Sequence, residues 1–271
     1  MKTKKSFGQH LLTDQTHLEK LLSLMDLSSE DIVVEIGPGT GILTLPVAKR
    51  VKKIYAIEIE RDIVKELKKN LKENNISNVE VIEKNFLSID LMKLSDKPFK
   101  IIGNIPYNIT SKILIKLFGE IDNIPEHRSL LQEAYLLTQL EVAERLVAKP
   151  STKAYSPLSL LIQFSSIPTL LHKVPRKAFT PPPKVESAFL SFKPKEILPD
   201  VKNPELVKSL IRISFQQRRK KIINSMIKFF EDKTALENAL KELKIDQNLR
   251  PENLSFEDYV RISGVASLRG V

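Results

Sequence analysis

Residues 101–108 read Ile-Ile-Gly-Asn-Ile-Pro-Tyr-Asn, and this stretch decides the fold. Together with Phe99, the apolar residues Ile101 and Ile102 predict a buried strand of an α/β sheet. The Gly, Asn and Pro that follow predict that the strand ends there. In sheets of this kind, ligands bind at the carboxyl ends of the strands. We therefore expect a ligand site directly after this strand.

Residues 104–107 suit the activation of an exocyclic amine on a nucleobase, whose lone pair is delocalised into the ring. If the Asn104 side-chain oxygen and the Ile105 carbonyl accept the two amine hydrogens, the nitrogen moves toward a tetrahedral, nucleophilic geometry. Pro106 has a fixed φ and no N–H, so it stiffens the turn. Tyr107 offers a ring on which the base stacks, worth roughly 1–3 kcal/mol per base. The alternative is an ordinary strand-ending turn with a half-buried tyrosine.

A glycine-rich turn comes earlier in the chain. Residues 32–36 predict a strand, residues 37–41 read Gly-Pro-Gly-Thr-Gly, and a helical pattern follows. This order is typical of the first unit of a nucleotide-binding α/β fold, in which Gly37 and Gly39 let a ligand approach the backbone. The spacing lacks the last glycine of the dinucleotide fingerprint, which argues against NAD. A tight turn without a ligand is the alternative.

Polar residues end the next two predicted strands. Glu58 lies in the strand at 54–59, where a carboxylate can accept both ribose hydroxyls of an adenosyl cofactor. Asn85 follows the strand at 79–82 and is a candidate for a hydrogen bond to the adenine. The alternatives are a solvent-facing acid and an ordinary turn asparagine. Strands that alternate with helices at this rhythm predict a mainly parallel, doubly wound sheet.

Residues 181–183 are three successive prolines, which predict a stiff, extended arm. Such an arm can present Phe179 to the face of a base opposite the one stacked on Tyr107. A rigid connector without a ligand is the alternative.

The C-terminal part of the chain has a different pattern. Residues 193–204 have the composition of a linker, and the sequence beyond them is helical. We therefore expect a catalytic domain at 1–194 and a helical, RNA-binding domain at 195–271. Four consecutive cations are predicted on one of its helices, where either solvent or a phosphate backbone neutralises them. They are Arg218, Arg219, Lys220 and Lys221.

Composition restricts the class of protein. The chain of 271 residues has a formal net charge of +10, which favours a polyanionic partner: RNA, DNA or an anionic membrane surface. It contains no cysteine, and its four histidines are scattered without ligand spacing, so we expect no metal. No apolar run reaches the ~18 residues of a membrane span. No apolar signal core follows the N-terminus. We expect a cytoplasmic, monomeric protein without a membrane partner.

The sequence resembles the KsgA family of ribosomal RNA adenine N6,N6-dimethyltransferases, relatives of the Erm enzymes, over nearly the whole chain. The resemblance depends on short motifs in the family's order and spacing. These are Phe-Gly-Gln at 7–9 with Leu12 and Asp14, Val-Glu-Ile-Gly-Pro-Gly-Thr-Gly at 34–41, Glu58, Gly-Asn-Ile-Pro-Tyr-Asn at 103–108, Phe-Thr-Pro-Pro-Pro-Lys-Val at 179–185, and Gln-Arg-Arg-Lys at 217–220. It implies a Rossmann-like class I methyltransferase sheet with a small C-terminal all-helical domain.

The resemblance also implies S-adenosylmethionine as methyl donor, with no metal. His10 and Leu12 are then expected to close over this cofactor, and Gly37 and Gly39 to pass its methionine end. The family more often has Asn at the position of His10.

Three further residues are expected to contact the cofactor by the same resemblance. Glu58 holds its ribose, Asn85 meets its adenine, and Asn104 touches both the cofactor and the target amine. Asp is more usual than Asn85, and Asn85 must present its carbonyl oxygen to accept a hydrogen bond from the adenine amine.

The resemblance implies dimethylation of two adjacent adenosines near the 3′ end of 16S ribosomal RNA, in the small ribosomal subunit or its precursor. The expected reaction is an in-line displacement on a flipped-out adenine. The alternatives are an Erm-like methyltransferase of 23S ribosomal RNA and a non-catalytic ribosome assembly factor. DNA adenine methylation is disfavoured, because such enzymes usually carry Pro-Pro-Tyr after the Asp or Asn and a separate base-reading domain.

Overall fold

The computed structural model describes residues 10–266, and contacts within the chain divide it into two compact units. The first unit comprises the chain up to residue 118 together with 125–143 and 167–194. The second comprises 119–124, 144–166 and the chain from residue 195 onward. One border thus falls between residues 194 and 195. The assignment of catalysis to 1–194 and of RNA binding to 195–271 stays a prediction.

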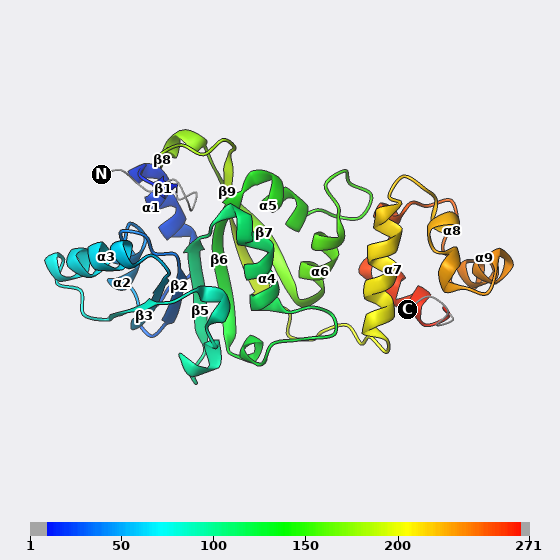
Figure 1. Ribbon diagram of the computed structural model, residues 1–271, viewed down its shortest axis with the longest axis horizontal. Helices are drawn as coiled ribbons and strands as arrows, with labels where there is room; N and C mark the ends of the chain where they lie inside the picture. Colours follow the sequence, from blue (N-terminus) through cyan, green and yellow to red (C-terminus); the bar gives the residue numbers. More distant parts are fainter. Residues whose placement is uncertain (1–9, 267–271) are drawn as a thin grey trace. The chain divides into compact units, whose positions relative to one another are not determined.

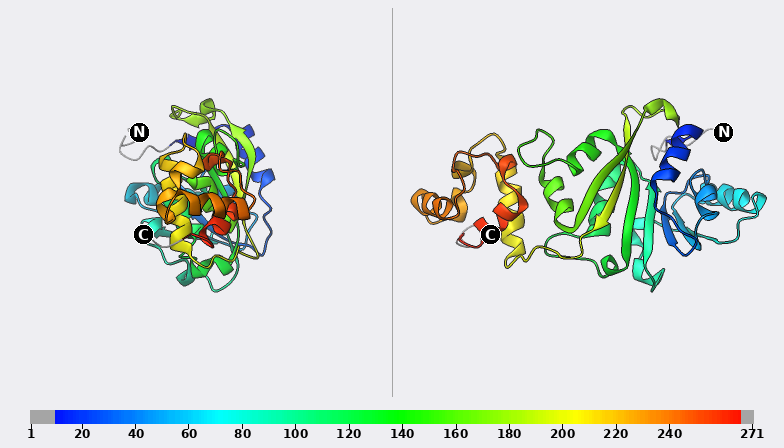
Figure 2. Two further views of the ribbon diagram at one scale, coloured as in Figure 1. Left: turned by 90° about the vertical axis from the view of Figure 1, so that its right-hand side faces the viewer. Right: turned by 180° about the vertical axis from the view of Figure 1, so that it is seen from behind.

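A seven-stranded sheet forms the centre of the first unit (Figures 1 and 2). Strands β2 to β6 pair in parallel in the order β4-β3-β2-β5-β6, and β9 and β7 extend the sheet beyond β6, with β9 antiparallel to β6. This largely parallel α/β sheet confirms the expected fold class. The strands are β2 (Ile32–Ile36), β3 (Lys53–Glu58), β4 (Val79–Glu83), β5 (Phe99–Asn104), β6 (Leu131–Gln139), β7 (Ser166–Val174) and β9 (Ser187–Pro194).

Crossover connections join the parallel strands, and they contain α-helices except between β4 and β5, where two short 3-10 helices lie. A separate pair of short antiparallel strands, β1 (Leu11–Leu12) and β8 (Phe179–Thr180), joins two segments far apart in the chain. Within residues 10–266, no helix combines the length and the apolar composition needed to cross a membrane. The α-helices of the first unit are α1 (Gln15–Leu24), α2 (Thr44–Ala48), α3 (Arg61–Glu73) and α4 (Thr110–Phe118), and α5 (Leu140–Leu146) crosses the border to the second unit.

The two central strands β2 and β5 are buried because neighbouring strands and helices cover them. Val33 and Val34 of β2 and Ile101 and Ile102 of β5 are all fully buried. A strand covered on both faces is apolar on both sides of the pleat, which is why 99–102 and 32–36 are apolar except for the buried Lys100 and Glu35. Burial of these runs fixes the centre of the sheet.

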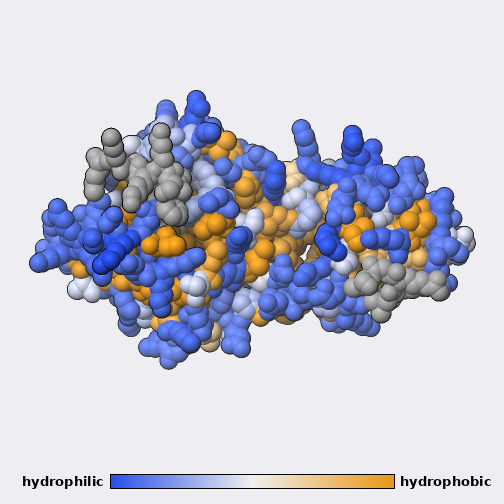
Figure 3. All heavy atoms as spheres, viewed as in Figure 1, coloured by the Kyte–Doolittle hydropathy of each residue, from blue (hydrophilic) through white to orange (hydrophobic). Residues whose placement is uncertain are grey.

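The second unit is helical and has its own hydrophobic core. In that core the Tyr259 hydroxyl donates to the Pro251 carbonyl and shares a hydrogen bond with Ser214. The face shown in Figure 3 is largely hydrophilic over this unit. The expected helical pattern of the C-terminal region is confirmed. The α-helices of the second unit are α6 (Pro157–Ser165), which precedes the C-terminal region, and α7 (Pro204–Gln216), α8 (Ile222–Ser225), α9 (Lys233–Glu242) and α10 (Phe256–Ser263) within it.

The cations at 218–221 lie in the connection between α7 and α8, so the prediction that they are on a helix is wrong. The chain has no apolar residue from Gln216 to Lys221. A helix continued through these residues has no side chain to bury in the core, and packing of an apolar face supplies most of a helix's stability.

Candidate active site

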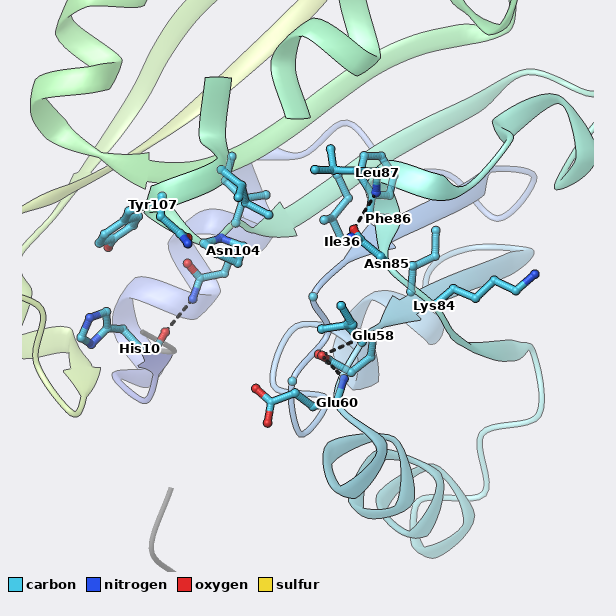
Figure 4. Close-up of a pocket in the computed structure, with 18 of the residues that line it drawn as sticks. His10, Ile36, Glu58, Glu60, Lys84, Asn85, Phe86, Leu87, Asn104 and Tyr107 are labelled. Atoms are coloured by element: carbon cyan, nitrogen blue, oxygen red, sulfur yellow. Dashed lines mark hydrogen bonds between the residues drawn. The ribbon is translucent and has the colours of Figure 1, made fainter. Parts of the chain in front are cut away.

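A cavity of about 250 Å³ lies at the carboxyl ends of β2, β3 and β5 (Figure 4). These strands end side by side, because Ile36 pairs with both Ile57 and Gly103. The cavity is therefore at the sheet edge where the sequence predicted a ligand site. The cavity is lined by residues that the sequence predicts to be catalytic or cofactor-binding. They are His10, Gly37, Gly39, Glu58, Asn85, Asn104, Pro106 and Tyr107.

Asn104, the last residue of β5, has a fixed amide orientation. Its Nδ2 donates to the backbone carbonyl of His10 at 2.7 Å, as Figure 4 shows. A carbonyl only accepts, so the nitrogen must face His10 and the Oδ1 atom faces away as an acceptor. The structure thus presents the acceptor oxygen that the sequence assigned to this side chain.

Tyr107 begins the short 3-10 helix Tyr107–Ile109, directly after Pro106. Its hydroxyl shares a hydrogen bond of 2.6 Å with the buried Ser187 Oγ at the start of β9. Burial raises the pKa of the Tyr107 phenol, with the Ser187 hydrogen bond opposing the rise, so the ring stays neutral at physiological pH. The tyrosine is therefore held at its hydroxyl end, with its ring at the cavity.

The turn after β2 brings backbone to the cavity through two glycines. Gly37 and Gly39 have φ values of +65° and +56°, in the left-handed region that favours glycine. A Cβ atom at Gly39 would also lie 3.2 Å from Leu11 Cδ2. Both residues are thus placed as a ligand-approach turn requires.

Glu58 ends β3 with one carboxylate oxygen satisfied and the other unpaired. Its Oε1 accepts from the backbone N–H groups of Ile59 at 2.9 Å and Glu60 at 3.1 Å. Its Oε2 is buried and has no hydrogen-bond partner among the described residues. Burial raises the pKa of this carboxyl, and the backbone hydrogen bonds oppose the rise. A buried acceptor without a partner costs free energy, which a ligand hydroxyl at the cavity would remove.

Asn85 caps the 3-10 helix Phe86–Ser88 beside the cavity. Its Oδ1 accepts from the Leu87 N–H at 2.9 Å. The oxygen that was expected to face an adenine amine therefore already holds one hydrogen bond, and its second lone pair is what remains for a ligand. Lys116 of α4, which the sequence reasoning missed, donates to the carbonyls of Leu87 and Ile89 and holds this segment in place.

Two residues expected at the site do not line this cavity. Leu12 and Phe179 pair across β1 and β8, and their side chains are buried in the core of the first unit, 6% and 2% exposed. Leu11, not Leu12, lines the cavity. The pairing of strands so far apart in the chain leaves no local signal from which this could be found. The motif at 7–9 lies outside the described residues.

The four cations are in the second unit and differ in their contacts. The Arg218 guanidinium donates to the Glu252 carboxylate at 2.9 Å and to the Lys153 carbonyl at 2.7 Å. Lys221 donates to Asn248 Oδ1 at 2.8 Å. Arg219 and Lys220 are exposed. These last two are the cations best placed for an external phosphate.

Glu35 of β2 is a buried acid that the sequence reasoning did not single out. It is 1% exposed, and its Oε2 has no hydrogen-bond partner among residues 10–266. Burial raises the pKa of its carboxyl to about 7, the Thr44 hydroxyl opposes the rise, and the charge of Glu58 adds to it. It lines a small hollow of about 40 Å³ that Gly37 and Asn104 also line.

The described residues contain no group of three or more His, Cys, Asp or Glu side chains arranged to hold a metal ion. The donors at the cavity are amides, backbone groups and a carboxylate with one unpaired oxygen. This donor set fits a polar organic ligand with hydroxyl groups.

Known proteins are similar to this chain in sequence and fold over nearly their whole length. A family model described as "Ribosomal RNA adenine dimethylase" matches residues 1–267. The chain is 39% identical over 268 residues to "Ribosomal RNA small subunit methyltransferase A" of Rippkaea orientalis, covering 97% of both chains. It is 34% identical over 274 residues to the protein of the same name from Caldanaerobacter subterraneus, covering 99% of this chain and 98% of that one.

Two solved structures resemble the chain closely. A dimethyladenosine transferase from Plasmodium falciparum has a TM-score of 0.76 at 28% identity, over 95% of this chain and 99% of that one. The 23S rRNA methyltransferase ErmE has a TM-score of 0.71 at 24% identity, over 94% and 98%. The second likeness shows a shared fold.

The substitution Glu35→Gln should stabilise the protein at pH values above 7 but not near pH 4.5, the ordinary pKa of this carboxyl. The folded state keeps the Glu35 proton up to about pH 7, whereas the unfolded chain releases it near 4.5. Wild-type stability therefore falls between these two pH values and then levels off, by about 3 kcal/mol at most. Gln carries no such proton, so its advantage grows over the same range. Urea unfolding across this pH range measures it.

The matched control is Glu83→Gln, which changes an exposed acid at the end of the neighbouring strand β4. Its stability should follow the wild-type pH curve. Parallel pH curves for Glu35→Gln and wild type would show that the Glu35 carboxyl is already ionised in the folded protein.

Proposed function

The chain belongs to the ribosomal RNA adenine dimethylase family, and on that premise we propose that it dimethylates two adjacent adenosines near the 3′ end of 16S ribosomal RNA. S-adenosylmethionine is the proposed methyl donor and the N6 amine of each adenosine the acceptor. The names of the most similar relatives favour small-subunit RNA. The observation that carries the chemistry is the hydrogen bond from Asn104 to the His10 carbonyl, which turns the Asn104 oxygen into a fixed acceptor.

The residues of the cavity fit such a donor. The unpaired Oε2 of Glu58 is placed to accept from ribose hydroxyls, and the turn at Gly37 and Gly39 exposes backbone to the methionine end. The second lone pair of the Asn85 oxygen is available to the adenine amine. When bound, S-adenosylmethionine supplies an electrophilic methyl group on a sulfonium.

The chain's own contribution is to position and activate the target amine. Asn104 Oδ1 and the Ile105 carbonyl accept its two hydrogens, which directs the nitrogen lone pair toward the methyl group. Tyr107 supports the flipped-out base. After transfer the cationic nitrogen is acidic and loses a proton to solvent. The monomethylated amine still has one hydrogen to donate to one of these acceptors, so a pocket with room for the methyl group allows a second cycle.

The proposed partner is the small ribosomal subunit or a precursor of it, which an enzyme acting on 16S RNA meets in the cytoplasm. The net charge of +10 and the exposed cations Arg219 and Lys220 support contact with a phosphate backbone. We propose that the protein acts as a monomer without a metal.

Transfer of labelled methyl groups to small subunits purified from a strain that lacks this modification tests the proposal. Digestion of the RNA to nucleosides should give N6,N6-dimethyladenosine in 16S RNA. Label only in large-subunit RNA would instead show an Erm-like 23S enzyme. Binding to small subunits without any label would show a non-catalytic assembly factor.

Replacing Asn104 by Ala should lower kcat by about 100-fold or more, because it removes an acceptor aimed at the reacting amine. Affinity for small subunits should persist, since the Asn104 amide is one contact of a large RNA surface. Methyl transfer and filter binding on the same preparation measure the two effects. Asn74→Ala, at an exposed position after α3, is the control and should behave as wild type. Near-normal turnover of Asn104→Ala would contradict the mechanism.

Replacing both Arg219 and Lys220 by Ala should weaken subunit binding and reduce its salt dependence. The plot of log affinity against log salt has a negative slope, and each removed cation that touches a phosphate makes this slope less steep by about 0.7–0.9. Binding measured at several salt concentrations gives this slope. The control removes two exposed cations from α3, Lys65 and Lys69, and should leave the slope unchanged. Equal slopes for both double variants would place the RNA contact elsewhere.

A further inference from the structure

Lys116, in the last turn of α4, contacts a wall of the cavity from outside it. Its Nζ atom donates to the Ile89 carbonyl at 2.6 Å and to the Leu87 carbonyl at 3.3 Å. The ammonium also lies 5.7 Å from the centre of the Phe86 ring. Phe86 and Leu87 line the cavity, whereas Lys116 does not. Any effect of this lysine on a bound ligand must therefore pass through the segment 85–89.

The segment 85–89 is built around a single turn of 3-10 helix, Phe86–Ser88. Inside this turn the Ile89 N–H donates to the Phe86 carbonyl at 3.1 Å. A helix leaves its last carbonyls without partners of its own, and a cationic side chain near its end can bond to them. The carbonyls of Leu87 and Ile89 lie at the end of the turn and just beyond it, and both accept from Lys116. The ammonium thus supplies the donors that so short a turn lacks.

Asn85 depends on the same turn for its orientation. Its Oδ1 atom accepts from the Leu87 N–H, and Figure 4 draws this bond as a dashed line. The Ser88 hydroxyl donates to the Asn85 carbonyl at 2.8 Å. Leu87 is therefore bonded to Asn85 through its N–H and to Lys116 through its carbonyl. Through Leu87, the lysine fixes the direction of the Asn85 amide.

The environment of the Lys116 ammonium strengthens these bonds. Burial lowers the pKa of this group, and the charge of Asp90 opposes the fall. Hydrogen bonds from an ionised donor that has lost part of its water are stronger than those of an exposed lysine. If the amine is removed, two part-buried carbonyls lose their donor, which costs free energy unless the segment moves toward water. We therefore expect the segment to leave its present arrangement when Lys116 is replaced.

We propose that Lys116 is a positioning residue for the methyl donor, because its ammonium holds the segment 85–89 in the arrangement that receives the adenosyl part. The inference deepens the proposed function and rests on it. It concerns affinity for the donor and not methyl transfer, since the reacting amine is positioned by Asn104 at the end of another strand. If the segment keeps the binding arrangement about a tenth of the time, affinity for the donor falls about tenfold.

The test compares Lys116→Met, Lys116→Arg and wild type for the dissociation constants of S-adenosylmethionine and S-adenosylhomocysteine, measured calorimetrically without RNA. Met keeps an unbranched apolar stem and loses the amine, so both ligands should bind about tenfold more weakly. Arg keeps the charge and the N–H donors and should bind both within about threefold of wild type. Lys112→Met, an exposed lysine on the same helix, is the control and should bind as wild type.

Three further measurements separate positioning from a general loss of stability. 5′-Methylthioadenosine lacks the amino-acid end of the donor, so Lys116→Met should weaken its binding by the same factor. At saturating S-adenosylmethionine, kcat on small subunits should stay within about twofold of wild type. In the free protein, hydrogen exchange should become faster at the Leu87 and Ile89 amides and not at the glycine turn 37–41. Thermal unfolding shows whether each variant is folded at the temperature of titration.

The inference is overturned if Lys116→Met binds S-adenosylmethionine as tightly as wild type, or if the Met and Arg variants are equally weak. It is also overturned if 5′-methylthioadenosine binds with unchanged affinity, because the effect then lies at the amino-acid end. A wild-type protein that binds no S-adenosylmethionine refutes both the proposed function and this inference. A wild-type protein that binds it but methylates neither ribosomal RNA refutes the function alone, and the comparison of affinities still decides the role of Lys116.

Discussion

The parallel register of three strands is the constraint on which the site depends. Because β3, β2 and β5 are paired without a shift, Ile57, Ile36 and Gly103 lie in one row across the sheet. The residues that follow this row leave the sheet together, which brings the glycine turn, Glu58 and Asn104 to one cavity. Burial of apolar strands thus places the backbone of Gly37, Glu58 and Asn104, whereas the hydrogen bond to the His10 carbonyl orients the Asn104 side chain.

Some polar atoms of the cavity already have hydrogen-bond partners within the protein and others do not. The atoms without a partner determine which ligand groups the cavity can bind. Hydrogen bonds that fix geometry engage one atom of each side chain: Asn104 Nδ2, Glu58 Oε1 and Asn85 Oδ1. What remains for ligands is mainly acceptor capacity, which suits hydroxyl and amine hydrogens. The apoprotein bears the cost of these unpaired acceptors, a common feature of preorganised sites.

Residues at strand ends could be predicted from the sequence because strand, turn and polar residue are neighbours in the chain. This holds for Gly37, Gly39, Glu58 and Asn104, whose placement at one edge follows from the fold class. The burial of Leu12 and Phe179 could not be predicted, because it depends on a strand pair between residues about 170 positions apart. The loop at 218–221 was missed because charge repulsion and the lack of an apolar face outweighed the helical pattern on both sides.

Lys116 connects two segments that line the cavity, the turn at Tyr107 and the segment after Asn85, into one structural element. It belongs to α4, which starts directly after the Tyr107 turn, and its amine bonds to carbonyls of the segment that follows Asn85. Lys116 therefore links the segment after Asn85 to the helix that follows the Tyr107 turn. Any free energy by which one substrate orders this element must also appear in the affinity for the other, since such coupling is reciprocal. A link of this kind changes the affinity for the second substrate by the same factor whichever of the two binds first.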